Sequence, residues 1–508
     1  AKQETYDFLE DVYSEIVPAY ESEYFNINCD ETFGLGAGPA KKMVEDYGLA
    51  EVYARHINRI YNILKKYDKK VMMWGDIAKE HPEIVPKLPK DMIVLTWGYR
   101  AEEYFDDYID PFTKLNLDFI VAPGVSCWNR LWCDYKIAFE NISNFVRDGA
   151  ANGTLGMMNT TWDDDGENLF SYNWVPLLWG SEVSWEPVKL EGDRQEDRHA
   201  REERIVDFNS KLDEVFYGVE GENIAELLWD INELRGHPYC KFRHPFDGKL
   251  FWQDYMDVEP LGDFEFDKQR QSKAAKLIEA CDEIIAGLKK AKSRAVYNAR
   301  SFDFAVFAVK RIRFLAQSQL TAAALDRRIA SDSASEYEVF EQRLGDLIGQ
   351  LDELRAEYVR LWRIENRGWW LDKNLSKYDE LKKQLISKKN KIWIRVSNKF
   401  FVKSIDVEIV SACPKGEIRY TLDGSEPSGS SELYDGEFVV DGSAVIKAAF
   451  FRDGEKLSGD ELEVKKLKVT KSKEVAGLNP GLKYRYYEVE KMWGMPNFAG
   501  LDEVKEGT

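Results

Sequence analysis

Two adjacent carboxylates, Asp30 and Glu31, are the sequence feature best suited to chemistry. They close the run "YFNINCDETFGLGAG", which alternates like a β-strand before a glycine-rich segment begins. Neighbouring residues in a strand point to opposite faces, so both acids reach one ligand only where the strand has stopped. Such a pair can protonate a leaving group and stabilise positive charge on a carbon atom. We therefore expect an acid-catalysed reaction at this position.

Aromatic and polar side chains follow four further β-like runs, "KKVMMWGD", "DMIVLTWGYR", "LDFIVAPGVSCWN" and "TLGMMNTTWDDDG". The candidates at their ends are Trp74, Asp76, Trp97, Trp128, Asn129, Trp162 and Asp164. Indole faces pack on the apolar faces of sugar rings, and carboxylates accept hydrogen bonds from sugar hydroxyls. These residue types together predict a sugar-binding pocket.

A strand-helix alternation must bring these ends together. One helical segment, with apolar residues from Val44 to Leu64, separates the first two runs. Continuous apolar runs separated by helices indicate parallel strands buried on both faces. In a (β/α)₈ barrel the carboxyl ends of all strands converge on one face. We predict an α/β fold over residues 1–190, a partial (β/α)₈ TIM-type barrel.

Three further segments follow the predicted barrel. Helical periodicity dominates residues 191–388, which predicts an α-helical region. Residues 389–470 contain alternating strands separated by DG and SG turns, a pattern typical of a small β-sandwich. Residues 471–508 are too short for a domain of their own.

The composition excludes several classes of function. The 508 residues include 90 acidic and 70 basic side chains, a net charge of −20 that repels phosphate backbones. Nucleic acid is therefore not an expected partner, and no apolar run reaches the roughly 18 residues of a membrane span. The six cysteines form no CxxC pair and the five histidines no HExxH motif. We expect no metal, no cofactor and no disulfide framework.

The motifs resemble those of a known family. "FNINCDETFGLG", with "MMWGD", "TTWDDDG" and "YTLDGSEPS", is similar to the family 20 glycoside hydrolases, the β-N-acetylhexosaminidases. The helical region resembles the extension of bacterial members, and "GEIRYTLDGSEPS" resembles the chitobiase/hexosaminidase C-terminal domain. The family's acid pair ends strand four of its barrel, so the resemblance implies strands four to eight here. It also implies a chain truncated at both ends, with "GLNPGLKYRYYE" opening a further accessory domain.

The resemblance implies a mechanism and a substrate. In that family the 2-acetamido oxygen of the sugar attacks the anomeric carbon and forms an oxazolinium intermediate, with net retention. Asp30 would bind the acetamido group, Glu31 would act as acid and base, and Trp74, Trp97 and Trp162 would surround the sugar. The implied substrates are glycans or chito-oligosaccharides that end in β-linked GlcNAc or GalNAc. The implied location is secreted, periplasmic or at the cell surface.

The sequence also departs from the family pattern. Asn26, Asn28 and Cys29 replace a histidine and two glycines before the acid pair, and Trp128 and Asn129 stand where a tyrosine usually binds the acetamido carbonyl. The resemblance also implies that the first three barrel strands are missing, and a second hypothesis is therefore a catalytically silent carbohydrate-binding or scaffolding fragment. The resemblance implies that Asp164 is the carboxylate that binds the outer hydroxyls of the sugar, although "SEVSWE", with Trp185 and Glu186, can be aligned there instead.

Several residues have simpler interpretations. We interpret Cys29 as a packed thiol, because small thiols are commonly buried. Asp163 and Asp165 are expected to stabilise a turn. The helical tryptophans Trp362, Trp369 and Trp370 are expected to pack rather than to bind a second sugar.

Overall fold

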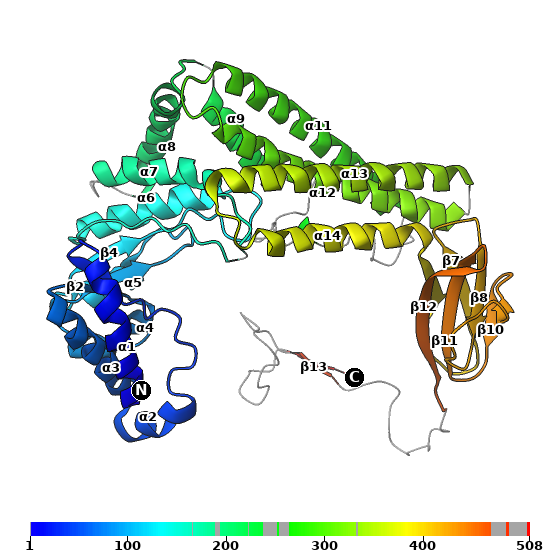
Figure 1. Ribbon diagram of the computed structural model, residues 1–508, viewed down its shortest axis with the longest axis horizontal. Helices are drawn as coiled ribbons and strands as arrows, with labels where there is room; N and C mark the ends of the chain where they lie inside the picture. The colour runs from blue at the N-terminus through cyan, green and yellow to red at the C-terminus, as the bar shows by residue number, and fades with distance from the viewer. Residues whose placement is uncertain are drawn as a thin grey trace. The chain divides into compact units, whose positions relative to one another are not determined.

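The computed structural model describes residues 2–164, 166–187, 194–221, 223–236, 251–252, 264–331, 334–468, 484–486 and 505–507 (Figure 1). The chain divides into two compact units, which are described separately. The first consists of Ala1–Ile392 with Val410–Gly416, and the second of Trp393–Ile409 with Glu417–Thr508. The predicted boundary near residue 190 therefore falls inside the first unit.

A parallel sheet forms the base of the site. Its strands lie in chain order and are β1 (Tyr24–Asn26), β2 (Lys70–Trp74), β3 (Ile93–Trp97) and β4 (Phe119–Ala122). Two parallel bridges, Val121 to Met157 and Gly124 to Thr160, add the fifth predicted run along β4. The predicted α/β class with parallel strands is confirmed. Closure into a barrel remains a proposal, for which this unreversed strand order is the supporting observation.

Helices connect these strands, as the alternation predicts. They are α1 (Gln3–Ile16), α2 (Lys41–Tyr47), α3 (Leu49–Leu64), α4 (Asp76–Glu80), α5 (Asp106–Thr113), α6 (Tyr135–Ala151) and α7 (Trp174–Trp185). The single helix predicted between the first two runs is instead two helices. Gly48 separates them because its backbone has a φ of 84°, which a continuous helix does not allow.

The inner face of the sheet is apolar. Met72, Ile93 and Leu95 pack with Trp74 and Ala122 in one buried cluster. Residues two apart in a strand share a face, so Trp74 and Trp97 continue the rows that this cluster begins. The carboxyl ends of β2 and β3 thereby present indole rings next to a rigid core.

Long helices make up the remainder of the first unit. They are α8 (Arg194–Lys211), α9 (Ile224–Gly236), α11 (Phe264–Arg294), α12 (Ser301–Ser331), α13 (Ala334–Glu365) and α14 (Leu371–Ser387). Helices α11 to α14 pack in sequence order, α12 between α11 and α13 (Figure 1). The predicted helical region is confirmed. Of the helices in the described residues, none is long and apolar enough to cross a membrane.

The second unit is rich in β-structure, as predicted. Its strands are β5 (Ile392–Val396), β6 (Phe400–Phe401), β7 (Ile405–Ser411), β8 (Glu417–Thr421), β9 (Glu432–Leu433), β10 (Phe438–Val440), β11 (Ala444–Arg452) and β12 (Glu455–Lys466). They form a three-stranded sheet, β10-β7-β5, and a five-stranded sheet, β6-β12-β11-β8-β9. Beyond residue 468, only β13 (Tyr484–Tyr486) and β14 (Lys505–Gly507) are described, so the predicted segment 471–508 lies largely outside the described residues.

Candidate active site

A distorted turn brings the two acids to the end of β1. The predicted strand continued to Cys29, but β1 ends at Asn26 and left-handed backbone follows, with φ of 60° at Asn28, 80° at Cys29 and 50° at Glu31. Non-glycine residues rarely adopt these angles, and such strain is concentrated at functional sites. The turn lets neighbouring side chains reach one cavity, which a regular strand forbids.

Backbone hydrogen bonds fix the turn against β2. The N–H of Ile27 donates to the carbonyl of Met72, and the N–H of Trp74 donates to the carbonyl of Asn28, both at 2.9 Å. The backbone N–H of Glu31 then donates to a carboxylate oxygen of Asp76 at 2.8 Å. Asp76 therefore orients the acid pair from the start of α4.

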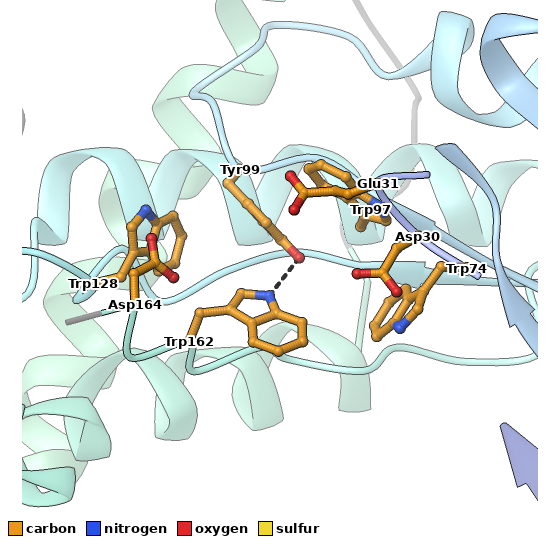
Figure 2. A pocket seen from close by; sticks show the side chains of 8 residues that line it. All are labelled: Asp30, Glu31, Trp74, Trp97, Tyr99, Trp128, Trp162 and Asp164. Carbon is orange, nitrogen blue, oxygen red and sulfur yellow. Dashed lines mark hydrogen bonds between the residues drawn. The ribbon is translucent and has the colours of Figure 1, made fainter. Parts of the chain in front are cut away.

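Both acids line one cavity of about 330 Å³ (Figure 2). The described residues that line it are Asp30, Glu31, Trp74, Trp97, Tyr99, Trp128, Trp162 and Asp164. The structure thus brings seven of the nine predicted site residues to a single cavity. The two others lie behind it, Asp76 under Glu31 and the buried Asn129 behind Asp164.

Aromatic rings form the walls of this cavity. The rings of Trp97 and Tyr99 stack with centroids 5.0 Å apart. The Trp128 ring also packs against Tyr99, with centroids 5.0 Å apart. Trp74 and Trp162 have centroids 6.3 Å apart. The indole N–H of Trp162 donates to the Tyr99 hydroxyl at 2.7 Å, which joins the two groups of rings (Figure 2).

Asp164 occupies the end of the cavity near Trp128 (Figure 2). The side-chain amide of Asn129 donates to Asp164 at 3.0 Å and holds this carboxylate. The alternative pair does not line the cavity: Trp185 is the last residue of α7 and Glu186 follows it. The Trp185 side chain is 92% exposed.

Comparison with known proteins agrees with this geometry. Residues 1–129 match the model of the glycosyl hydrolase family 20 catalytic domain, and residues 397–460 match the chitobiase/beta-hexosaminidase C-terminal domain. We call residues 1–129 the family 20 region, because they are similar to that catalytic domain. The resemblance expected from the sequence is confirmed, and glycoside hydrolase is the enzyme class of this family.

Two further comparisons used the whole chain. No curated protein sequence matches the chain. One similar solved structure is described as a GH138 enzyme targeting pectin rhamnogalacturonan II, with 12% sequence identity and a TM-score of 0.42. The alignment covers 76% of this chain and 64% of that one.

Burial shifts the acidity of groups around the acid pair of the family 20 region. Desolvation raises the pKa of the Cys29 thiol to about 12, and the charges of Asp30 and Asp76 add to this effect. Burial also raises the pKa of Asp76, opposed by the hydrogen bond from Glu31. Cys29 is consequently a protonated thiol at neutral pH, as its interpretation as a packed side chain predicts.

The segment that carries Asp164 is held by the helical region. Glu167 is buried and accepts hydrogen bonds from Arg311 of α12 at 2.9 Å, from Trp252 at 2.8 Å and from Lys377 of α14 at 3.0 Å. Asn374 donates to the carbonyl of Gly166 at 2.6 Å. These contacts connect the segment after Asp164 to α12 and α14, which lie 144 to 210 residues later in the chain.

Turn residues support the same segment. The Asp163 carboxylate accepts the backbone N–H of Asn168 at 3.2 Å, a turn-stabilising role that matches the prediction. Asp165 lies outside the described residues. Trp362 is buried as predicted. Trp369 and Trp370 precede α14 and are 82% and 56% exposed, and the Trp370 indole lies against Gly166.

Sequence reasoning missed three residues of the site. Tyr99 lines the cavity. Its position in "TWGYR", two residues after Trp97, was the signal in the sequence. Residues two apart leave a strand on one face, so this signal could have been used. Glu167 and Arg311 gave no local signal, because their contact spans 144 residues.

Proposed function

We propose that this chain is a retaining exo-β-N-acetylhexosaminidase that acts by substrate assistance. The observation that carries the proposal is the cavity in which Asp30 and Glu31 share walls of tryptophan. A volume of about 330 Å³ lies at the lower end of small-ligand pockets and suits one terminal sugar ring. The family 20 match over residues 1–129 supports the same reaction.

In the proposed reaction, each acid has one task. Glu31 protonates the glycosidic oxygen, and its carboxylate then removes a proton from the water that attacks the anomeric carbon. Asp30 accepts a hydrogen bond from the acetamido N–H and stabilises the positive charge of the oxazolinium ring. The acetamido oxygen is the nucleophile, so no side chain forms a covalent intermediate.

Tyr99 is assigned the acetamido carbonyl. The proposed contact uses its hydroxyl, which accepts a hydrogen bond from Trp162 and can donate its own proton. In the sequence-based interpretation, Trp128 and Asn129 stood in place of the family's tyrosine. A tyrosine on the loop after β3 supplies the missing hydroxyl from another strand.

The charge of the cavity supports a cationic transition state. The described lining residues include three carboxylates, Asp30, Glu31 and Asp164, and no basic side chain. Negative charge near the anomeric carbon stabilises an oxocarbenium-like species in a site shielded by indole rings. The proposed substrates are glycans or chito-oligosaccharides ending in β-linked GlcNAc or GalNAc, met by a secreted, periplasmic or cell-surface enzyme.

Release of p-nitrophenol from its β-N-acetylglucosaminide and galactosaminide tests this function. We expect turnover by the unchanged chain, a loss of about 100-fold or more in Glu31→Gln, and no loss in Glu45→Gln on exposed α2. NMR of the first-formed sugar should show the β-anomer. Sugar binding without any turnover would contradict the proposal and favour the silent carbohydrate-binding fragment.

A further inference from the structure

Side chains from two helices hold the peptide groups on either side of Asp30. Before Asp30, the backbone carbonyl of Cys29 accepts a hydrogen bond from the hydroxyl of Tyr53, in α3, at 3.2 Å. After Asp30, the backbone N–H of Glu31 donates to Asp76, the first residue of α4, at 2.8 Å. Because peptide groups are planar, restraining these two groups restrains the backbone dihedral angles of Asp30 and the direction of its side chain.

The backbone at Cys29 needs such a restraint. Its φ is 80°, in the left-handed region that glycine adopts readily and residues with a side chain adopt rarely. Strained angles of this kind persist only where surrounding contacts enforce them. The hydrogen bond from Tyr53 acts on the carbonyl of the strained residue itself. Without that bond, Cys29 can relax toward an ordinary φ, and Asp30, the next residue, rotates with it.

Tyr53 is a rigid donor that keeps its proton. Its side chain is only 2% exposed and lies on the buried face of α3 with Ile57 and Ile60. Burial, together with the nearby charges of Asp76 and Asp30, raises the pKa of its hydroxyl. A tyrosine hydroxyl has a single proton to donate, and here the acceptor is the backbone carbonyl. The hydrogen bond is therefore present over the whole range of pH in which a glycosidase works.

We propose that Tyr53 is a positioning residue for Asp30, an inference that rests on the proposed function. In that reaction Asp30 must meet the acetamido N–H as the oxazolinium ring forms, so a small rotation of Asp30 weakens the stabilisation of the transition state. Tyr53 is not among the described residues that line the cavity, and it acts through the Cys29 carbonyl. Its effect concerns the acetamido group, whereas protonation of the glycosidic oxygen is the task of Glu31.

Tyr53→Phe tests this role, because the variant keeps the buried ring and loses only the hydroxyl. With p-nitrophenyl β-N-acetylglucosaminide, we expect kcat to fall about tenfold with a smaller change in KM. The phenyl glycoside has a poorer leaving group and depends more on protonation by Glu31, yet it should lose the same factor. Tyr217→Phe is the matched control and should change neither rate. Tyr217 is 3% exposed, and its hydroxyl bonds Ser301 of α12 at 3.2 Å.

A second variant, Cys29→Gly, tests the part played by backbone strain. Glycine adopts a φ of 80° without cost, so the turn should keep its form when the bond from Tyr53 is removed. In the Cys29→Gly background we expect Tyr53→Phe to lower kcat by at most about threefold, because the two residues act on one peptide group. Tyr217→Phe should have the same effect in both backgrounds.

Each outcome decides one question. An unchanged kcat in Tyr53→Phe would overturn the role of Tyr53 and leave the proposed function intact. A larger loss with the phenyl glycoside than with the p-nitrophenyl glycoside would also overturn it, because Glu31 would then be disturbed as well. An undiminished loss in the Cys29→Gly background would contradict the support of the strained turn. Absence of turnover of both glycosides by the unchanged chain would overturn the proposed function, and this inference with it.

Discussion

The guanidinium of Arg311 lies 2.9 Å from a carboxylate oxygen of Glu167, and both side chains are almost fully buried, with 1% and 3% exposed. Glu167 follows Asp164, which lines the cavity, by three residues. Arg311 belongs to α12 in the helical region. The helical region therefore stabilises the segment that carries Asp164, one of the residues that line the candidate active site.

Arg311→Met should weaken both folding and substrate binding. Removing the buried guanidinium leaves the charge of Glu167 poorly compensated by Lys377, whose side chain is 30% exposed, so we expect a loss of about 3 kcal/mol in the free energy of unfolding. We also expect a higher KM, because the segment bearing Asp164 loses its support. Urea unfolding and kinetics at a temperature where the variant is folded measure the two effects.

Arg313→Met is the matched control for that variant. Arg313 also lies on α12, but it pairs at 2.8 Å with the exposed Asp282 of α11. Exposed pairs contribute at most about 1 kcal/mol, and this one has no contact with the site. An increase in KM of the same size in both variants would contradict the specific role of Arg311.

Gly166→Ala should displace the same segment. Gly166 has a φ of 67°, and an added Cβ would lie 2.6 Å from the indole nitrogen of Trp370. Gly153 has a φ of 77° with nothing within 4 Å of an added Cβ. We expect each alanine to cost about 1 kcal/mol through backbone strain, and only Gly166→Ala to cost more and to raise KM. Equal losses of stability and unchanged KM values would exclude the predicted clash.

Tyr99→Phe should reduce catalysis with little change in folding. The variant keeps the ring that stacks on Trp97 but removes the hydroxyl that binds Trp162 and, in the proposal, the acetamido carbonyl. Loss of one such hydrogen bond in a shielded site lowers kcat about 10-fold to 100-fold. Substrates with an N-trifluoroacetyl group, a weaker acceptor, should lose less from the substitution. A uniform loss across both substrates would contradict the contact.

Asp76→Asn should change how stability depends on pH. Burial raises the pKa of Asp76 in the folded chain, so the stability contributed by its protonated form is present below the unfolded pKa. That contribution is lost as pH rises through the folded pKa. Asparagine still accepts the N–H of Glu31 and does not ionise. Urea unfolding should therefore show the variant gaining on the unchanged chain as the pH is raised from acidic to neutral. A constant difference in stability over this range would contradict the prediction.

Cys29 should resist thiol reagents in the folded chain. With a pKa of about 12, its thiolate fraction at pH 8 is on the order of a thousandfold below that of an ordinary cysteine. Iodoacetamide labelling followed by peptide mass spectrometry measures the rate, and the chain in guanidinium provides the reference. Equal labelling rates in the two states would show that the thiol is not protected.

Much of the architecture could be predicted because it depends on local pattern. Apolar runs separated by helical segments determined the parallel strands, and turn residues determined the β-rich unit. Where such predictions were wrong, one backbone angle was the cause. Gly48 divided a predicted helix, and left-handed residues at Asn28 and Cys29 ended a predicted strand early.

The sequence by itself determined which side chains follow the strand ends, and hence that Asp30 and Glu31 stand among tryptophans, because residues at the carboxyl ends of parallel strands share one edge. Only the tertiary structure decided how these side chains are held. The turn at Glu31 depends on Asp76, and the segment at Asp164 depends on Arg311. The first contact joins residues that are 45 positions apart, and the second joins residues that are 144 positions apart. Neither produces a periodic pattern in the sequence, because the strength of both contacts comes from burial and geometry that exist only after folding.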